Sequence, residues 1–125
     1  MEEPEYANRK FQKELSSGVV ALVLLAVLDR TREPLYGYQI AKQLESSGES
    51  LSMVKQGSLY PVLRSLEKSG FLESEVEPST SGPPRRYYRI TSLGRGALAQ
   101  WTGIWREGSA FVDEVLKGNI HVSDH

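Results

Sequence analysis

The sequence predicts a mainly helical fold with one small β-hairpin, built around a single core. The chain has 125 residues, of which 39% are hydrophobic and 25% charged, so it can bury a core and lacks the composition of a disordered chain. Three helical patterns come first, two strand-like runs around a turn cluster follow, and one long helical pattern comes last. This length is typical of one domain with at most a short appendage.

The first helix is expected from about Phe11 to Leu28. Apolar residues occur on nearly every side of it, so we expect other elements to enclose it. Its longest apolar run, Gly18 to Leu28, has 11 residues, which is short of the ~20 that cross a bilayer. The acidic start of the chain does not resemble a signal peptide. We therefore expect no membrane contact and a cytoplasmic location, with residues 1–14 forming an N-terminal arm that is either flexible or held by a neighbouring subunit.

The second helix is expected from about Tyr36 to Glu45. Charged residues that end in Pro34 stop the first helix before it, and the Ser-rich segment 46–50 breaks the second helix after it. Its short apolar face consists of Ile40, Ala41 and Leu44.

The third helix is expected from about Ser58 to Ser69, with Ser58 as its N-cap and Gly70 as its C-terminal stop. Pro61 then falls in the first turn, where its missing N–H costs little. One face is an apolar stripe made of Leu59, Val62, Leu63 and Leu66. Another face carries polar residues at helical spacing, namely Tyr60, Arg64, Glu67 and Lys68.

Two strands are expected next, at about Phe71–Glu77 and Arg85–Thr91. The first run alternates in character, although the side that faces the core stays open, and the second run is rich in strand-forming residues. The seven residues between them, Pro78–Pro84, are turn formers. We therefore expect a β-hairpin with a long tip.

A long helix is expected from about Ser92 to Leu116, followed by a disordered tail at residues 119–125. Its apolar residues recur every three or four positions and form one broad face. Several glycines weaken it, at ~1 kcal/mol each relative to alanine, so it needs a partner surface. We expect residues 92–118 to be a dimerisation helix whose interface contains Leu93, Trp101, Ile104, Trp105, Phe111, Val112 and Val115.

The order of these elements is that of a winged helix-turn-helix at residues 1–91, in which one helix enters a groove and the hairpin reaches the flanking backbone. The net charge of the whole chain is -1, so a nucleic-acid surface must be a local patch. Residues 55–95 contain seven basic and four acidic residues, a charge of +3, which leaves -4 for the remainder. The positive charge is thus concentrated in the segment that would contact phosphates.

Three motifs in this order resemble the PadR family of prokaryotic transcriptional regulators. They are LYGYQI at 35–40, GSLYPVLRSLEKSG at 57–70 and RYYRITSLG at 86–94, within a match of about 16–98. The resemblance implies a homodimeric repressor on a roughly palindromic operator that is released by a small molecule or another cellular signal. A single helix after the hairpin is similar to the short-tailed subgroup, which includes regulators of multidrug efflux genes.

The candidate DNA-binding side chains lie on the third helix and at the tip of the hairpin. Arg64 could contact a guanine with two hydrogen bonds, whereas the alternative for this helix face is ordinary solvent exposure. In the strand, Arg89 is expected to pair with Glu73 or Glu75, and the same pairing is the alternative for Arg86. The DNA-contacting set is Gln56, Ser58, Tyr60, Arg64, Lys68, Arg85 and Arg86.

Trp101 and Trp105 lie one turn apart on the apolar face of the last helix. One interpretation is that they pack only in a dimer core, where large aromatic side chains are common. In the other, which the family resemblance implies for the position of Trp105, they also line a site where a planar aromatic effector stacks. The sequence leaves both interpretations open.

The sequence gives no reason to expect an enzyme, a metal or a cofactor. The chain has no cysteine, and its two histidines, His121 and His125, fall in the predicted disordered tail, which is poorly suited to a site that needs three or four converging ligands. Neither a phosphate-binding glycine loop nor a nucleophilic triad order occurs. The alternative function is a winged helix that binds another protein without recognising a DNA sequence, which the near-neutral net charge keeps open.

Overall fold

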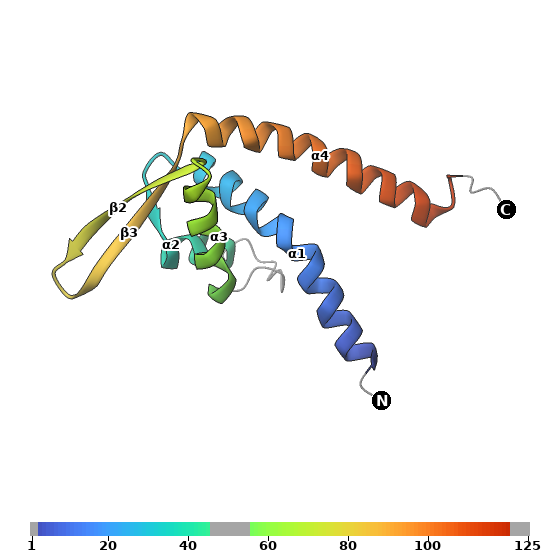
Figure 1. Cartoon of the computed structure of the whole chain (residues 1–125), viewed down its shortest axis with the longest axis horizontal. Coiled ribbons are helices and arrows are strands. Elements are labelled where there is room, and N and C mark those ends of the chain that lie inside the picture. The colour runs from blue at the N-terminus through green and yellow to red at the C-terminus, as the bar shows by residue number, and fades with distance from the viewer. Residues whose placement is uncertain (1–2, 46–55, 121–125) are drawn as a thin grey trace.

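A computed structural model describes residues 3–45 and 56–120, apart from the side chains of residues 45 and 56–58. It confirms a mainly helical chain with a small antiparallel sheet, arranged as a winged helix-turn-helix followed by one long helix (Figure 1). In chain order the elements are α1 (Glu3–Arg30), β1 (Leu35–Tyr36), α2 (Gly37–Glu45), α3 (Gln56–Lys68), β2 (Leu72–Ser79), β3 (Gly82–Ile90) and α4 (Ser92–Lys117). The predicted break at 46–50, most of the predicted tail and both histidines lie outside the described residues.

The core forms where the C-terminal half of α1 meets α3, the sheet and the start of α4. The buried apolar side chains are Val20, Leu24, Leu25, Leu28, Ile40, Leu59, Leu63, Leu66, Leu72, Tyr88, Ile90 and Ala97. Figure 1 shows α1 and α4 diverging from this core as two arms. Burial of these side chains removes a large apolar area from water and is the main stabilising term of the fold.

The first helix is longer and more exposed than the sequence predicted. α1 begins at Glu3, so the described part of the N-terminal arm is helical. The expectation that other elements enclose the whole helix was wrong for its N-terminal half, where Tyr6, Phe11 and Leu15 are exposed. The buried side chains of α1, namely Val20, Leu24, Leu25 and Leu28, all belong to its second half.

By length and composition alone, α1 is also a helix that could cross a membrane. The core helix of a soluble protein passes the same test, which makes this weak evidence. In α1 the fully buried Leu24 and Leu25 belong to the core that α3 and β3 complete. One side of its second half is therefore already covered by protein, although only 22% of its apolar stretch is buried.

The sheet contains a strand that the sequence did not predict, and its hairpin has a shorter tip. β1 pairs with β3 through Leu35 and Tyr36, which gives the strand order β1-β3-β2. The predicted seven-residue tip was wrong, because β2 reaches Ser79 and β3 begins at Gly82. The prolines of this region lie where the register shifts, since proline cannot donate a ladder hydrogen bond.

α3 begins two residues earlier than predicted. Ser58 is therefore inside the helix and is not its N-cap, and Pro61 is the sixth residue instead of a first-turn residue. The predicted stop at Gly70 is confirmed. Gly70 has a φ of 84°, and the next N–H, that of Phe71, donates to the Leu66 carbonyl at 3.0 Å.

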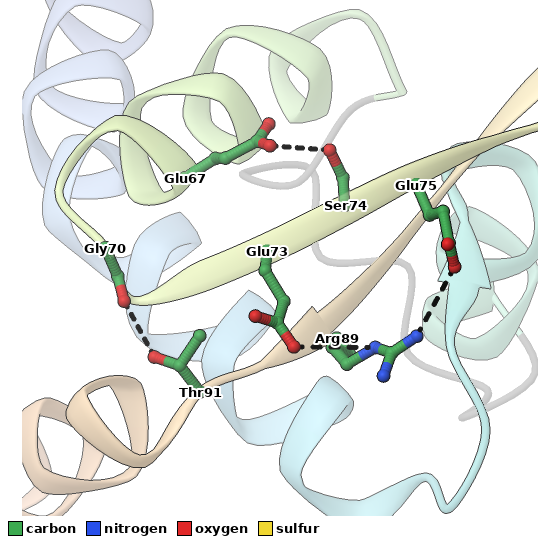
Figure 2. Close-up of polar contacts among 7 residues, drawn as sticks. All are labelled: Glu67, Gly70, Glu73, Ser74, Glu75, Arg89 and Thr91. Carbon is green, nitrogen blue, oxygen red and sulfur yellow. Dashed lines mark hydrogen bonds and ion pairs between the residues drawn. The ribbon is translucent and has the colours of Figure 1, made fainter.

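Thr91 joins the end of α3 to the start of α4 (Figure 2). Its hydroxyl donates to the Gly70 carbonyl at 2.7 Å and accepts a hydrogen bond from the Gly94 N–H at 3.0 Å. It is thus the N-cap of α4, which ends one residue beyond the predicted Leu116. Gly94 packs so tightly here that a Cβ atom would overlap the Phe71 carbonyl oxygen.

This contact predicts opposite effects for two glycines of α4. Gly94→Ala should lower the free energy of unfolding by about 1–3 kcal/mol, because the added methyl group has no space. Gly96→Ala, whose Cβ would meet no atom within 4 Å, should raise it by about 0.5–1 kcal/mol through its helix propensity. Urea unfolding of both variants at one protein concentration tests this. Equal stability of the two variants would contradict the packing argument.

Candidate nucleic-acid interface

The exposed face of α3 carries the polar side chains that the sequence placed there. Leu59, Leu63 and Leu66 point into the core, so the opposite side of the helix must face solvent. Arg64 and Lys68 are exposed, and the Tyr60 side chain is 41% exposed. Gln56 and Ser58 lie at the start of α3, but their side chains are outside the described residues.

The Tyr60 ring is held against the first residue of α2. A Cβ atom on Gly37 would lie 2.6 Å from Cε1 of Tyr60 and 2.8 Å from its hydroxyl oxygen. Only a glycine permits this contact between the two helices of the helix-turn-helix. Gly37 thus lets the Tyr60 ring pack directly on the backbone at the start of α2.

The three arginines of β3 have different partners because successive strand residues point to opposite faces. The Arg85 guanidinium lies 4.6 Å from the centre of the Tyr36 ring. On the other face, Arg86 donates from Nη1 to the Ser74 hydroxyl at 2.9 Å. Arg85 and Arg86, which the sequence grouped as one DNA-contacting pair, therefore cannot act on the same side of the hairpin.

Arg89 forms the ion pairs that the sequence expected for it (Figure 2). Its Nε atom lies 3.8 Å from Glu73, and its Nη2 atom lies 3.7 Å from Glu75. All three side chains are more than half exposed, so these pairs stabilise the hairpin only weakly.

Charged groups of α3 and the hairpin meet at the buried Tyr88. The Ser74 hydroxyl donates to Oε2 of Glu67 at 2.6 Å, which links β2 to α3 (Figure 2). Burial raises the pKa of the Tyr88 hydroxyl, the Glu67 carboxylate raises this pKa further, and Arg86 and Arg64 lower it. Charged groups from both α3 and the hairpin thus act on this one buried hydroxyl.

A second group of aromatic and cationic side chains, which lies on β1 and α2, was not identified from the sequence. Tyr36 and Tyr38 stack with ring centres 6.4 Å apart, and Nζ of Lys42 lies 5.5 Å from the centre of the Tyr38 ring. Tyr38 is 51% exposed, so this group lies at the surface of the helix-turn-helix. The spacing of Tyr38 and Lys42, one helical turn apart, was the pattern that could have revealed this pair.

A groove of about 410 Å³ lies between α1 and α4. Trp101 is half-buried and contacts Phe71 edge-on, with ring centres 5.4 Å apart, whereas the Trp105 side chain is 47% exposed. The groove is almost entirely apolar and is lined by Leu15, Gly18, Val19, Ala21, Leu22, Trp101, Ile104 and Trp105. Further predicted interface residues are exposed on α4, namely Leu93, Phe111, Val112 and Val115.

Comparison with known protein families gives a match to the transcriptional regulator PadR-like family over residues 24–100. The chain belongs to this family. It is also 33% identical to the transcriptional regulator Rv3488 of Mycobacterium tuberculosis over 116 residues, which cover 92% of this chain and 95% of that protein. Its PadR-like relatives are transcriptional regulators and not enzymes.

Solved structures of PadR-like proteins share its fold. A PadR family transcriptional regulator from Eggerthella lenta is 31% identical with a TM-score of 0.74, covering 93% of this chain and 97% of that one. A PadR-like transcription factor from Bacteroides fragilis is 28% identical with a TM-score of 0.67, covering 85% and 98%. PadR-like regulators bind DNA and typically dimerise, so the exposed faces of α3 and α4 are the surfaces to test in this PadR-like chain.

No cluster of three or more His, Asp or Glu side chains suited to a metal ion occurs among the described residues.

The contact between Gly37 and Tyr60 predicts a change in binding without loss of the fold. Gly37→Ala should displace the flexible end of the Tyr60 side chain and weaken DNA binding by about 0.5–1.5 kcal/mol, the usual contribution of one hydrogen bond. Fluorescence anisotropy with a labelled duplex measures this effect. In a Tyr60→Ala background the same substitution should have little further effect, and an equal loss there would show that Gly37 acts by another route.

Proposed function

We propose that this PadR-like chain is a homodimeric transcriptional repressor that binds a palindromic operator through α3 and the hairpin segment 78–86. The observation that carries the proposal is the position of Tyr60, Arg64 and Lys68 on the exposed side of a helix whose other side is fixed in the core. Such a helix can enter a major groove without any rearrangement of the core. A protein with this function would act in the cytoplasm, where a prokaryotic operator is found.

Local charge supports this surface even though the whole chain has a net charge of -1. Arg64 and Lys68 lie one turn apart on α3, and Arg86 adds a third cation on the hairpin, linked to α3 through Ser74 and Glu67. Two like charges one turn apart repel each other mildly in solvent. Phosphate groups would remove this repulsion and release their counterions.

The exposed apolar residues of α1 and α4 support a dimer. Ile104, Phe111 and Leu116 are exposed on α4, and Phe11 is exposed on α1. A monomer would leave these side chains in water along two diverging arms (Figure 1). A second copy would cover them and hold two α3 helices at the spacing of half-sites, about 34–36 Å.

The apolar groove beside Trp105 supports a planar aromatic effector. Its volume of about 410 Å³ is large enough for a small aromatic molecule, and its walls offer the Trp105 ring for stacking. Such a ligand would release DNA only if it favoured a dimer geometry in which the distance between the two α3 helices no longer matches the spacing of the half-sites. The alternative is that Trp101 and Trp105 serve packing alone.

The alternative function is a winged helix that binds a protein partner, which the near-neutral net charge permits. A gel shift at increasing salt separates the two functions. A DNA reader should lose affinity steeply as salt rises, in proportion to the phosphates that it contacts. Binding that is insensitive to salt, or without preference for the promoter of the protein's own gene, would support the protein-binding module.

Arg64 provides a direct test of the proposed reading helix. Arg64→Ala should weaken specific DNA binding by ~1–3 kcal/mol while the dimer stays intact, because a bidentate contact to a base is lost. Arg32→Ala, which removes an exposed cation from the loop between α1 and β1, is the matched control and should bind as the wild type does. Unchanged operator affinity of Arg64→Ala would remove this residue from the reading face.

Trp105 provides the test of the effector site. In the wild type, planar aromatic dyes that enter the groove should quench tryptophan fluorescence, and Trp105→Ala should abolish this quenching. Sedimentation of the variant checks that it is still a dimer. Retained quenching would assign the site to Trp101 or to another part of the chain, and absence of quenching in the wild type would favour the packing interpretation.

A further inference from the structure

A short chain of hydrogen bonds connects α3 to both strands of the hairpin. The Ser74 hydroxyl of β2 donates to Oε2 of Glu67 on α3 at 2.6 Å. The Ser74 hydroxyl oxygen also accepts a hydrogen bond from Nη1 of Arg86 on β3 at 2.9 Å. A hydroxyl has one proton and two lone pairs, so Ser74 can donate to the Glu67 carboxylate and accept from the Arg86 guanidinium at the same time. Figure 2 shows the Glu67 and Ser74 half of this arrangement.

The position of Glu67 needs an explanation. It lies on the polar side of α3, between Arg64 and Lys68 in the sequence, where phosphate groups of a duplex would approach. A carboxylate there repels phosphate, so charge alone would make Glu67 unfavourable for DNA binding. If Glu67 favours DNA binding despite this repulsion, it must do so through the residues that its side chain contacts.

We infer that Glu67 and Ser74 are positioning residues that fix the Arg86 guanidinium in the angle between α3 and the hairpin for a phosphate of the bound duplex. The inference rests on the proposed DNA-binding function and adds two residues to it. Arg86 uses one N–H group for Ser74, and a guanidinium has four more. These remain available for the phosphate backbone between the two grooves.

Ordering before binding is the physical advantage of this arrangement. A free arginine side chain has many rotamers and loses that freedom when a phosphate immobilises it. If Ser74 and Glu67 have already restricted Arg86, less entropy is lost on binding. The packing around the hydroxyl supports a fixed geometry, because Ser74 and Glu67 are both half-buried and Tyr88 beside them is buried.

The other arginines of β3 are held in different ways. Arg85 lies over the Tyr36 ring on the opposite face of the hairpin, and Arg89 pairs there with Glu73 and Glu75. Of the arginines in β3, Arg86 is thus the one that hydrogen bonds through Ser74 connect to Glu67 on α3. Its position relative to α3 depends on that link more than on the strand alone.

The test compares DNA affinities of Glu67→Ala, Ser74→Ala, Arg86→Ala and the double variant Ser74→Ala/Arg86→Ala. The probe is a labelled duplex that the wild-type protein has enriched from a random-sequence library. We expect Glu67→Ala and Ser74→Ala each to weaken binding about three- to tenfold, which corresponds to the loss of one hydrogen bond. The double variant should bind as weakly as Arg86→Ala alone.

Glu67→Ala gives results of opposite sign for the two explanations. Removal of a negative charge near phosphate should strengthen binding if charge alone matters, whereas the positioning role predicts weaker binding. Glu73→Ala removes the same charge from the other face of the hairpin and should not weaken binding. Unchanged or stronger binding by both Glu67→Ala and Ser74→Ala, or losses that add fully in the double variant, would overturn the inference.

Two further measurements separate positioning from a purely structural role. Ser74→Ala should lower the slope of log affinity against log salt by about 1, as Arg86→Ala does, because one phosphate contact is lost. Glu67→Gln keeps an acceptor for the Ser74 hydroxyl and should retain most of the affinity even if Glu67→Ala fails to fold. If the wild type itself shows no salt-dependent DNA binding, the proposed function has failed; if it binds and Ser74→Ala keeps the full salt slope, only this inference has failed.

Discussion

The two elements proposed to contact DNA are held by the packing of leucine side chains between α1 and α3. Leu24 and Leu25 of α1 and Leu59 and Leu63 of α3 are almost completely buried in one cluster with side chains of β2 and β3. Because this cluster occupies one side of α3, the polar side of the helix has to face solvent. The same cluster covers the inner face of the sheet, so the hairpin is oriented by the packing that orients α3.

Local patterns in the sequence were sufficient to locate the helices, although not the starts of α1 and α3, and were insufficient for the sheet. The apolar stripe of α3, its end at Gly70 and the bounds of α4 follow from helical spacing and turn chemistry, which act over a few residues. β1 has two residues and exists only because Leu35 and Tyr36 pair with β3. The tip of the hairpin was mispredicted for the same reason, since cross-strand pairing extends β3 back to Gly82 through residues typical of turns.

The sequence was sufficient to name the cationic residues of the candidate site. It was insufficient to predict how their side chains are arranged. Strand alternation places Arg85 and Arg86 on opposite faces, but the sequence does not say which face meets α3. Glu67 carried no special meaning in the sequence, because an acid on a polar helix face is usually only solvated. Its importance comes from Ser74, seven residues away in the chain and 2.6 Å away in space.

Phe71 connects the proposed effector groove to the reading helix. Its N–H donates to the Leu66 carbonyl at the end of α3, its carbonyl accepts from the Thr91 N–H before α4, and its ring contacts Trp101. Thr91 adds a second link through the Gly70 carbonyl. Gly94 also packs directly on the Phe71 carbonyl, so the start of α4 is in close contact with the turn that follows α3. A ligand that reorients α4 at Trp105 would therefore carry α3 with it, and the spacing of the two α3 helices in a dimer would change even though neither helix touches the ligand.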